Sequence, residues 1–344
     1  MFREYESYIL GQLEKLIAIP SPSGFFAQVQ DYLLKEIESL GFKPSVSVKG
    51  GFSFCIGGEG EPVVLMAHAD TLGAQVKYIK PTGRLMVSRV GGLNPHNTET
   101  ENVTVHTREH GTVKGTLQLV DASTHVNKNY DVLRSFESNI EVVLDKNVTC
   151  AQDTRELGIM NGDFISLEPR FNLATDGYLK SRFLDDKIGV AILLGFAKYV
   201  SEKKLKLNRK VYIGITVYEE VLHAGGGFVP ADAVELLGID MGCVGELLDG
   251  SEHKVSIVAR DNYGPYNYEV ISKLVKLCQE KGIDFAVDCY QGYVSDVTVA
   301  LLAGHDVKHG LIGPGVYASH SYERTNIVAV KGSFNLLAAY LVQQ

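Results

Sequence analysis

The spacing of apolar positions changes twice along the chain and divides it into three stretches. The first stretch, residues 1–70, begins with apolar residues at helical spacing from Tyr8 to Ile17, and the Pro20–Gly24 segment interrupts them. A second helical pattern runs from about Phe26 to Leu40 and stops at a glycine. The run Pro62–Ala67 is almost wholly apolar and predicts a buried strand.

The second stretch, residues 71–176, lacks long helical periods. Short runs rich in β-branched and apolar residues alternate with turn signals that contain glycine, proline or asparagine. These runs are Gln75–Ile79, Leu85–Val90, Thr112–Val120 and Ile140–Leu144. The pattern predicts a small β-barrel or sandwich with a core of its own.

The third stretch, residues 177–344, returns to alternating helices and strands. Ile188, Ile192 and Phe196 lie at i, i+4 and i+8 and predict a helix that ends near Val200. A strand is expected at Val211–Val217, and two more helices near Gly264–Lys281 and Asn326–Val342. The simplest fold is one α/β domain made of residues 1–70 and 177–344, into which residues 71–176 are inserted as a β domain.

Composition and charge narrow the classes of function. The 344 residues carry a formal net charge of −8 and no basic tract, which argues against a nucleic-acid partner. No apolar run reaches the ~18 residues of a membrane span, and the acidic amino-terminal segment is unlike a secretory signal. Five widely spaced cysteines without a Cys-x-x-Cys pair suit a reducing cytoplasm and argue against a disulfide framework.

Two adjacent glutamates, Glu219 and Glu220, follow the buried strand predicted at Val211–Val217. Open α/β sheets bind their ligands at the carboxyl ends of such strands. Two carboxylates there cannot both stay unpaired in a low dielectric, so one needs a cation and the other is free to act as a base. The alternative is a solvated acidic turn, which is the commonest fate of neighbouring glutamates.

Other residues could complete a metal site, although each has an ordinary structural explanation as well. His68 and Asp70 lie two apart at the end of a predicted strand, where side chains of this spacing face the same way. Asp185 and the aspartate after it open a helix, where aspartate is a common cap. Asp240 interrupts an apolar, strand-like run and needs a partner, while His320 lies in a polar loop before the last helix.

Several familiar catalytic motifs are absent from the sequence. We find no glycine-rich phosphate loop, no Gly-x-Ser-x-Gly nucleophile elbow and no His-Glu-x-x-His helix. Nucleotide-binding, serine-hydrolase and zincin functions therefore lose support, and the other histidines are interpreted as surface or structural residues.

The order of the motifs is more specific than any one of them. His-x-Asp, Asp-Asp, Glu-Glu, Asp and His, in this order, resemble the co-catalytic metallopeptidases with an aminopeptidase-type α/β fold. The 117 positions from His68 to Asp185 leave room for an inserted domain, and this resembles metallopeptidase family 42, the glutamyl and deblocking aminopeptidases that form tetrahedral particles. The resemblance covers essentially the whole chain, including the Ile19–Gly24 segment. It implies a mixed-sheet sandwich with helices on both faces and an inserted small β-barrel.

The resemblance also implies a role for each site residue. His68 and Asp240 would hold one divalent metal ion, Glu220 and His320 would hold the other, and Asp185 would bridge the two. Glu219 would be the general base, and Asp70 would orient the site from behind. The ions would be zinc or cobalt, with manganese as a third candidate. The implied protein is a cytoplasmic homo-oligomer, such as a dodecamer, that removes residues from peptides with a free amino terminus and uses the inserted domain for assembly and access.

Three rival functions stay open at this stage. A metal-dependent deacylase or N-acyl amino acid hydrolase could use the same site. A glycoside hydrolase needs two carboxylates and no metal, but its mechanism would give no role to His68 and His320. A non-catalytic oligomeric scaffold with a structural metal site is the third.

Overall fold

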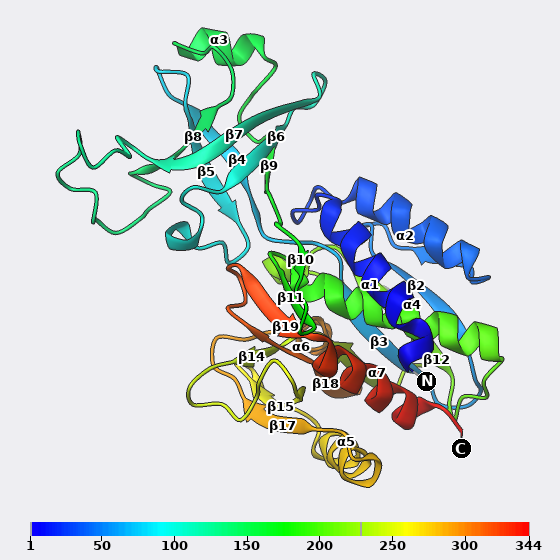
Figure 1. The fold of residues 1–344 in the computed structure, drawn as a ribbon. Helices are drawn as coiled ribbons and strands as arrows, with labels where there is room; N and C mark the ends of the chain where they lie inside the picture. The colour runs from blue at the N-terminus through cyan, green and yellow to red at the C-terminus, as the bar shows by residue number, and fades with distance from the viewer. Residues whose placement is uncertain (1, 228, 344) are drawn as a thin grey trace. The chain divides into compact units, whose positions relative to one another are not determined.

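The computed structural model describes residues 2–227 and 229–343, which form two compact units (Figure 1). The first unit combines Met1–Asp70 with Arg170–Gln344, and the second is Thr71–Pro169. The second junction comes before the expected boundary at residue 177. The reason is that β10 (Asn172–Leu173) pairs with β11 (Tyr178–Ser181), which pairs in turn with a strand of the first unit.

Four neighbouring parallel strands form the centre of the sheet in the first unit. They are β12 (Val211–Thr216), β3 (Val63–His68), β13 (Glu235–Ile239) and β18 (Lys308–Tyr317), in this order. Every residue of β3 and β13 is buried, as the apolar runs predict for strands covered on both faces. Because the strands are parallel, their carboxyl ends meet at one edge of the sheet.

Antiparallel strands extend this centre on both sides and make the sheet mixed. β2 (Phe52–Gly57) pairs with β12, and β15 (Val255–Asp261) and β19 (Glu323–Asn326) pair with β18. The shorter or outer strands are β1 (Ser45–Val46), β14 (Gly242–Val244), β16 (Gly264–Pro265) and β17 (Phe285–Cys289). The mixed sheet confirms the predicted fold class.

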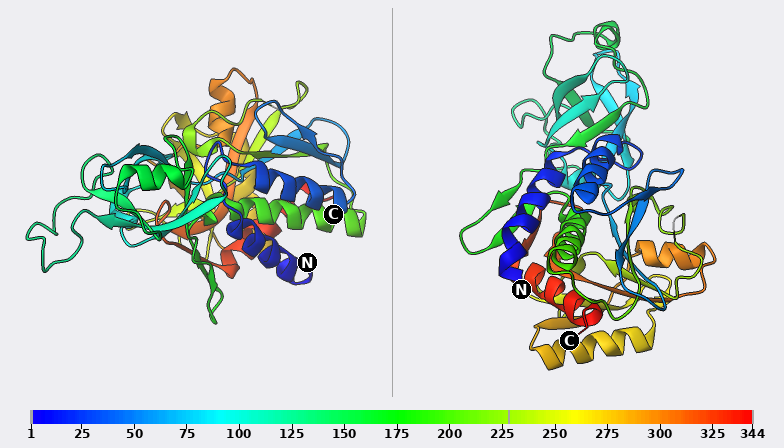
Figure 2. Two further views of the ribbon diagram at one scale, coloured as in Figure 1. Left: turned by 90° about the horizontal axis from the view of Figure 1, so that it is seen from above. Right: turned by 90° about the vertical axis from the view of Figure 1, so that its right-hand side faces the viewer.

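Helices cover both faces of this sheet (Figure 2). α1 (Phe2–Ala18), α4 (Leu184–Lys203) and α7 (Ile327–Leu341) lie side by side on one face, and α6 (Asp296–Leu302) lies on the other. The remaining helices are α2 (Ala27–Ser39) and α5 (Tyr268–Lys281). α4 is buried along nearly its whole length, and a side chain at Gly195 would meet Ile9 of α1 at 2.3 Å. No helix among residues 2–227 and 229–343 is long and apolar enough to cross a membrane.

The second unit is a closed barrel of six strands in the order β4-β5-β8-β7-β6-β9. Side chains along β7 alternate between exposed and buried, which is the pattern of a strand with one face on a core. The strands are β4 (Gly73–Ile79), β5 (Leu85–Val90), β6 (Asn102–His106), β7 (Thr112–Leu119), β8 (Ile140–Leu144) and β9 (Phe164–Leu167). Two short helices, η1 (Pro95–Asn97) and α3 (Ala151–Glu156), occur in its connections.

Candidate metal centre

The candidate residues lie at or just beyond the carboxyl ends of the parallel strands. His68 is the last residue of β3, and the register of β12 pairs it with Thr216. The 3-10 turn η2 (Glu219–Val221) follows β12 and carries both glutamates. Asp240 comes directly after β13, so it lies past the strand rather than inside a strand-like run as the sequence indicated. Sheet topology therefore brings together segments that are far apart in the sequence.

The remaining two residues come from other kinds of segment. Asp185 lies at the start of α4, but its φ of −75° and ψ of 107° are not helical. His320 lies in the turn between β18 and β19, so a strand separates it from the last helix, which the sequence did not indicate. Asp186 is also not helical, and it caps the regular part of α4 that follows it, because its Oδ1 accepts a hydrogen bond from the N–H of Gly189 at 3.1 Å.

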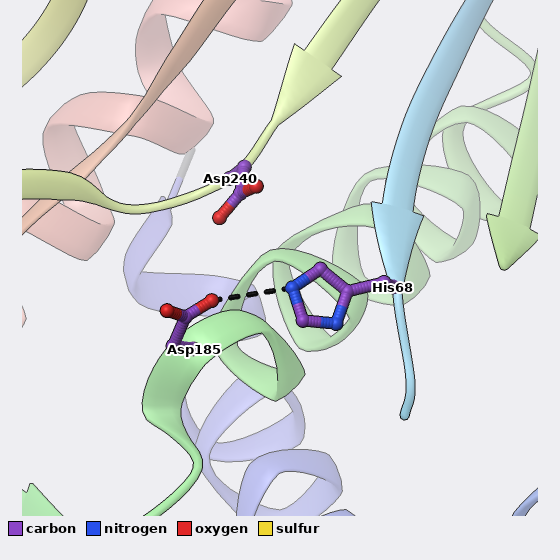
Figure 3. A group of neighbouring side chains, drawn as sticks. All are labelled: His68, Asp185 and Asp240. Carbon is purple, nitrogen blue, oxygen red and sulfur yellow. Dashed lines mark hydrogen bonds and ion pairs between the residues drawn. The ribbon is translucent and has the colours of Figure 1, made fainter. Parts of the chain in front are cut away.

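Two groups of three side chains could each hold a metal ion, and they share Asp185. The first is His68, Asp185 and Asp240, whose ligand atoms lie within 4.8 Å of one another. Figure 3 shows these three side chains converging from β3, α4 and the end of β13. Nε2 of His68 lies 3.2 Å from Oδ1 of Asp185, and all three residues are buried.

The second group is Asp185, Glu220 and His320, again within 4.8 Å. Nε2 of His320 lies 3.4 Å from Oε2 of Glu220 and 3.6 Å from Oδ2 of Asp185. Asp185 therefore turns one carboxylate oxygen to each group, as a ligand shared by two cations would do. The His320 side chain is 39% exposed, so this side of the centre is open to solvent.

The charges at the centre indicate that it needs a cation. Burial, followed by the charge of Asp185, raises the pKa of Glu220 well above its ordinary value and that of Asp240 to about 7. Burial also raises the pKa of Glu219 well above its ordinary value. These carboxylates cannot all ionise next to one another without a compensating charge, and imidazole with carboxylate is a donor set that suits divalent transition metals. The residues present therefore fit metal ions.

Glu219 lies beside both groups without belonging to either. Its Oε2 is 3.7 Å from Nε2 of His68, and its side chain is buried. A carboxylate in this place can exchange a proton with a water molecule held at the centre, provided that the water comes within hydrogen-bonding reach.

The carboxylate of Asp70 holds the turn that carries the two glutamates. Its Oδ1 accepts from the N–H of Glu219 at 3.1 Å, and its Oδ2 accepts from the N–H of Glu220 at 3.3 Å. The acceptor nearest to Nδ1 of His68 is the main-chain oxygen of Asp70, at 3.0 Å, whereas its carboxylate is 3.7 Å away. Asp70 thus contacts the imidazole of His68 mainly through its backbone, and its carboxylate holds the main chain of both glutamates.

A second buried carboxylate at the centre, Glu323, was not predicted from the sequence. Its Oε2 accepts from the N–H of Asp185 at 3.1 Å, and its Oε1 accepts from the N–H of His320 at 3.0 Å. Burial and then the charge of Asp185 raise its pKa well above the ordinary value. The only sequence signal was an acidic residue three positions after His320 in a polar segment, and such residues are usually solvated.

Comparison with known proteins agrees with this fold. The sequence model of the M42 glutamyl aminopeptidases matches residues 50–336. "Putative aminopeptidase YhfE" of Bacillus subtilis (strain 168) is 36% identical over 331 residues, which cover 96% of each chain.

Two solved structures share the fold. The TET aminopeptidase from the marine sediment archaeon Thaumarchaeota archaeon SCGC AB-539-E09 superposes with a TM-score of 0.87 at 18% identity, over 96% of each chain. The Pyrococcus horikoshii TET1 peptidase is described as able to assemble into a tetrahedron or a large octahedral shell. It superposes with a TM-score of 0.84 at 21% identity, over 96% of this chain and 98% of its own. With its sequence matched over most of its length, this chain belongs to the M42 glutamyl aminopeptidase family and is a peptide hydrolase.

Proposed function

We propose that the protein is a dinuclear metal-dependent aminopeptidase. His68 and Asp240 would hold one divalent ion, Glu220 and His320 the other, and Asp185 both. The observation that carries the proposal is the overlap of two three-residue donor groups at a single shared aspartate. Imidazole and carboxylate ligands suit zinc, cobalt or manganese, and zinc and cobalt are the first candidates.

Held by these residues, two divalent ions would polarise a peptide carbonyl and would lower the pKa of a water molecule toward neutrality. Glu219 would then accept the proton of that water at its carboxylate and later deliver it to the nitrogen of the departing amine. Burial suits Glu219 to this exchange, because the same low dielectric that disfavours its charge also excludes competing water. The hydrogen bond from the main-chain N–H of Glu219 to Oδ1 of Asp70 would keep the backbone of Glu219 in place between the two transfers.

The expected substrates are peptides with a free amino terminus. The exposed edge of His320 marks the side from which such a chain can approach. The acidic net charge gives no support to a nucleic-acid substrate. An N-acyl amino acid hydrolase could use the same donor groups and is the alternative that the experiment below separates.

We also propose a cytoplasmic homo-oligomer, with twelve copies as the first expectation. The tetrahedral assembly described for the Pyrococcus horikoshii relative supports this proposal. The location of the candidate site residues in one unit supports it as well. All seven candidate site residues belong to the α/β unit, which leaves the barrel unit, residues 71–169, available for assembly and for control of access. Five free, separated cysteines suit a reducing compartment.

The deciding experiment compares wild type with Glu219→Gln on a panel of free and N-acetylated aminoacyl chromogenic substrates. We expect activity on the free set only, restored by cobalt or zinc and removed by a chelator. Glu219→Gln keeps the shape of the side chain but cannot accept the proton, so kcat should fall by roughly 10²–10⁴. Its metal content and thermal unfolding should stay as in wild type.

Each outcome on the panel has a clear meaning. Near-normal turnover in the Glu219→Gln variant would remove Glu219 as the base. Hydrolysis of the acetylated set alone would move the protein to the deacylase alternative. Chelator-resistant activity would contradict the metal mechanism, and the absence of any hydrolysis would favour the scaffold.

A further inference from the structure

The Ile19–Gly24 segment between α1 and α2 has no part in the mechanism above, yet it is tied to the site. Two prolines and Gly24, whose φ is +94°, keep it from continuing either helix. Lys187 of α4, two positions after Asp185, donates from its buried Nζ to the main-chain oxygens of Leu16 at 2.8 Å and Ile19 at 2.7 Å. The segment is therefore anchored to the helix that begins at the shared ligand.

Two serine side chains of the segment are directed at the residues after β3. Ser21 donates from Oγ to the main-chain oxygen of Ala69 at 2.8 Å, and Ser23 donates from Oγ to Oδ2 of Asp70 at 2.5 Å. Both serines are buried, with 0% and 6% exposure. The bond from Ser23 to a carboxylate is of the short, charge-assisted type and is stronger than a bond between neutral groups.

Asp70 then accepts three hydrogen bonds at one fully buried carboxylate. One comes from the Ser23 hydroxyl, and the other two come from the main-chain N–H groups of Glu219 and Glu220. Without the hydroxyl, Oδ2 would keep only the longest of these three bonds, at 3.3 Å. The plane of the carboxylate would be less well fixed, and with it the turn that presents both glutamates.

We propose that Ser23 is a positioning residue for the Glu219–Glu220 turn and acts through the Asp70 carboxylate. Its hydroxyl fixes the rotation of that carboxylate, which fixes the main chain of the base and of the neighbouring ligand. The effect on rate rests on the aminopeptidase function proposed above. The effect on the turn does not, and it can be measured in the metal-free protein.

The kinetic test compares Ser23→Ala with two reference variants. Because a displacement of about 1 Å at a catalytic group can cost up to about 100-fold in rate, we expect kcat to fall by about 10- to 100-fold with little change in KM. Ser23→Thr keeps the hydroxyl and should recover most of the rate. Ser333→Ala removes another buried serine, which donates to the main-chain oxygen of Ala329 within α7, and should lose stability without losing kcat.

The second test measures amide hydrogen exchange of metal-free protein across the Glu219–Glu220 turn. Loss of one hydrogen bond should speed exchange there by about 2- to 10-fold in Ser23→Ala and leave it unchanged in Ser333→Ala. Should Ser23→Ala fail to fold, Ser23→Cys serves instead, since a thiol fills the same place but is a weak donor.

The two tests separate the possible failures. Unchanged exchange at the turn, with kcat no lower than in Ser333→Ala, would overturn the role of Ser23. Faster exchange in a protein that hydrolyses no peptide would leave that role intact and would count against the proposed function instead.

Discussion

At the scale of single residues, two buried carboxylates outside the donor groups organise the site through main-chain bonds. Asp70 accepts from the N–H groups of the two glutamates on η2. Glu323 accepts from those of Asp185 and His320. Each therefore fixes the backbone of two site residues while their own side-chain oxygens and nitrogens stay available to a cation. Contacts of this kind orient the residues that bind a metal ion, and their loss lowers metal affinity or activity.

We predict that Glu323→Gln weakens metal binding by about 10- to 100-fold. The amide of glutamine has one oxygen to accept with and an NH₂ group that cannot accept, so the N–H of either Asp185 or His320 loses its partner. Competition with a chromogenic chelator measures the affinity directly and needs no substrate.

The matched control is Glu235→Gln. Glu235 is also buried, and its carboxylate accepts from Arg209 at 2.8 Å and from Tyr340 at 2.6 Å, but it lies at the start of β13, at the opposite end from Asp240. This variant should lose stability and keep its metal affinity. Equal affinities for wild type and Glu323→Gln would show that Glu323 does not position the ligands.

At the scale of elements, the strands that the sequence predicted best are almost wholly apolar, because the sheet buries both of their faces. β3 and β12 were found in this way, and so were the polar residues that follow them. The seven-residue α6 was not predicted, because its sequence, Asp-Val-Thr-Val-Ala-Leu-Leu, is rich in β-branched residues. Such residues have a low helix propensity, so the helix depends on tertiary packing. The hydrogen bonds that Glu323 accepts from main-chain N–H groups could not be predicted either. They depend on how the turn between β18 and β19 packs against the start of α4.

An element-scale prediction concerns His106 at the end of β6 in the barrel. Burial, followed by the charge of Lys114, lowers the pKa of its imidazole to about 4, and its Nε2 contacts Oγ of Ser166 at 2.8 Å. In the unfolded chain the pKa is near 6.5, so the unfolded state binds the proton first as the pH falls. The stability contributed by neutral His106 is therefore complete above pH 6.5 and is lost between pH 6.5 and 4.

We expect the melting temperature of His106→Gln to fall less than that of wild type between pH 7 and pH 4.5, as calorimetry of the metal-free chain would measure. His110→Gln, at an exposed position after the same strand, should follow wild type across this range. Parallel pH profiles for wild type and His106→Gln would refute the assignment of a buried neutral imidazole.

At the scale of the whole molecule, the proposed function gives chemistry and assembly to different units. The donor groups, Glu219, Asp70 and Ser23 all belong to the α/β unit. The barrel unit contains a connection, residues 120–139 between β7 and β8, that exposes large apolar side chains in the isolated chain. They are Val126 (74% exposed), Tyr130 (49%), Val132 (41%) and Leu133 (80%). A concentration of such residues on one connection is typical of a surface that another protein chain covers.

The last prediction is that Leu133→Asp reduces the number of subunits in the particle while keeping peptidase activity on small substrates. A charge at an apolar contact must be buried without a partner, which disfavours association, whereas the barrel core does not use this exposed side chain. Asn129→Asp adds the same charge at a neighbouring exposed position and removes no apolar group, so it is the matched control. Light scattering over a range of concentrations measures the assembly. An unchanged particle in Leu133→Asp would exclude this connection from the interface, and a monomeric wild type would contradict the proposed oligomer itself.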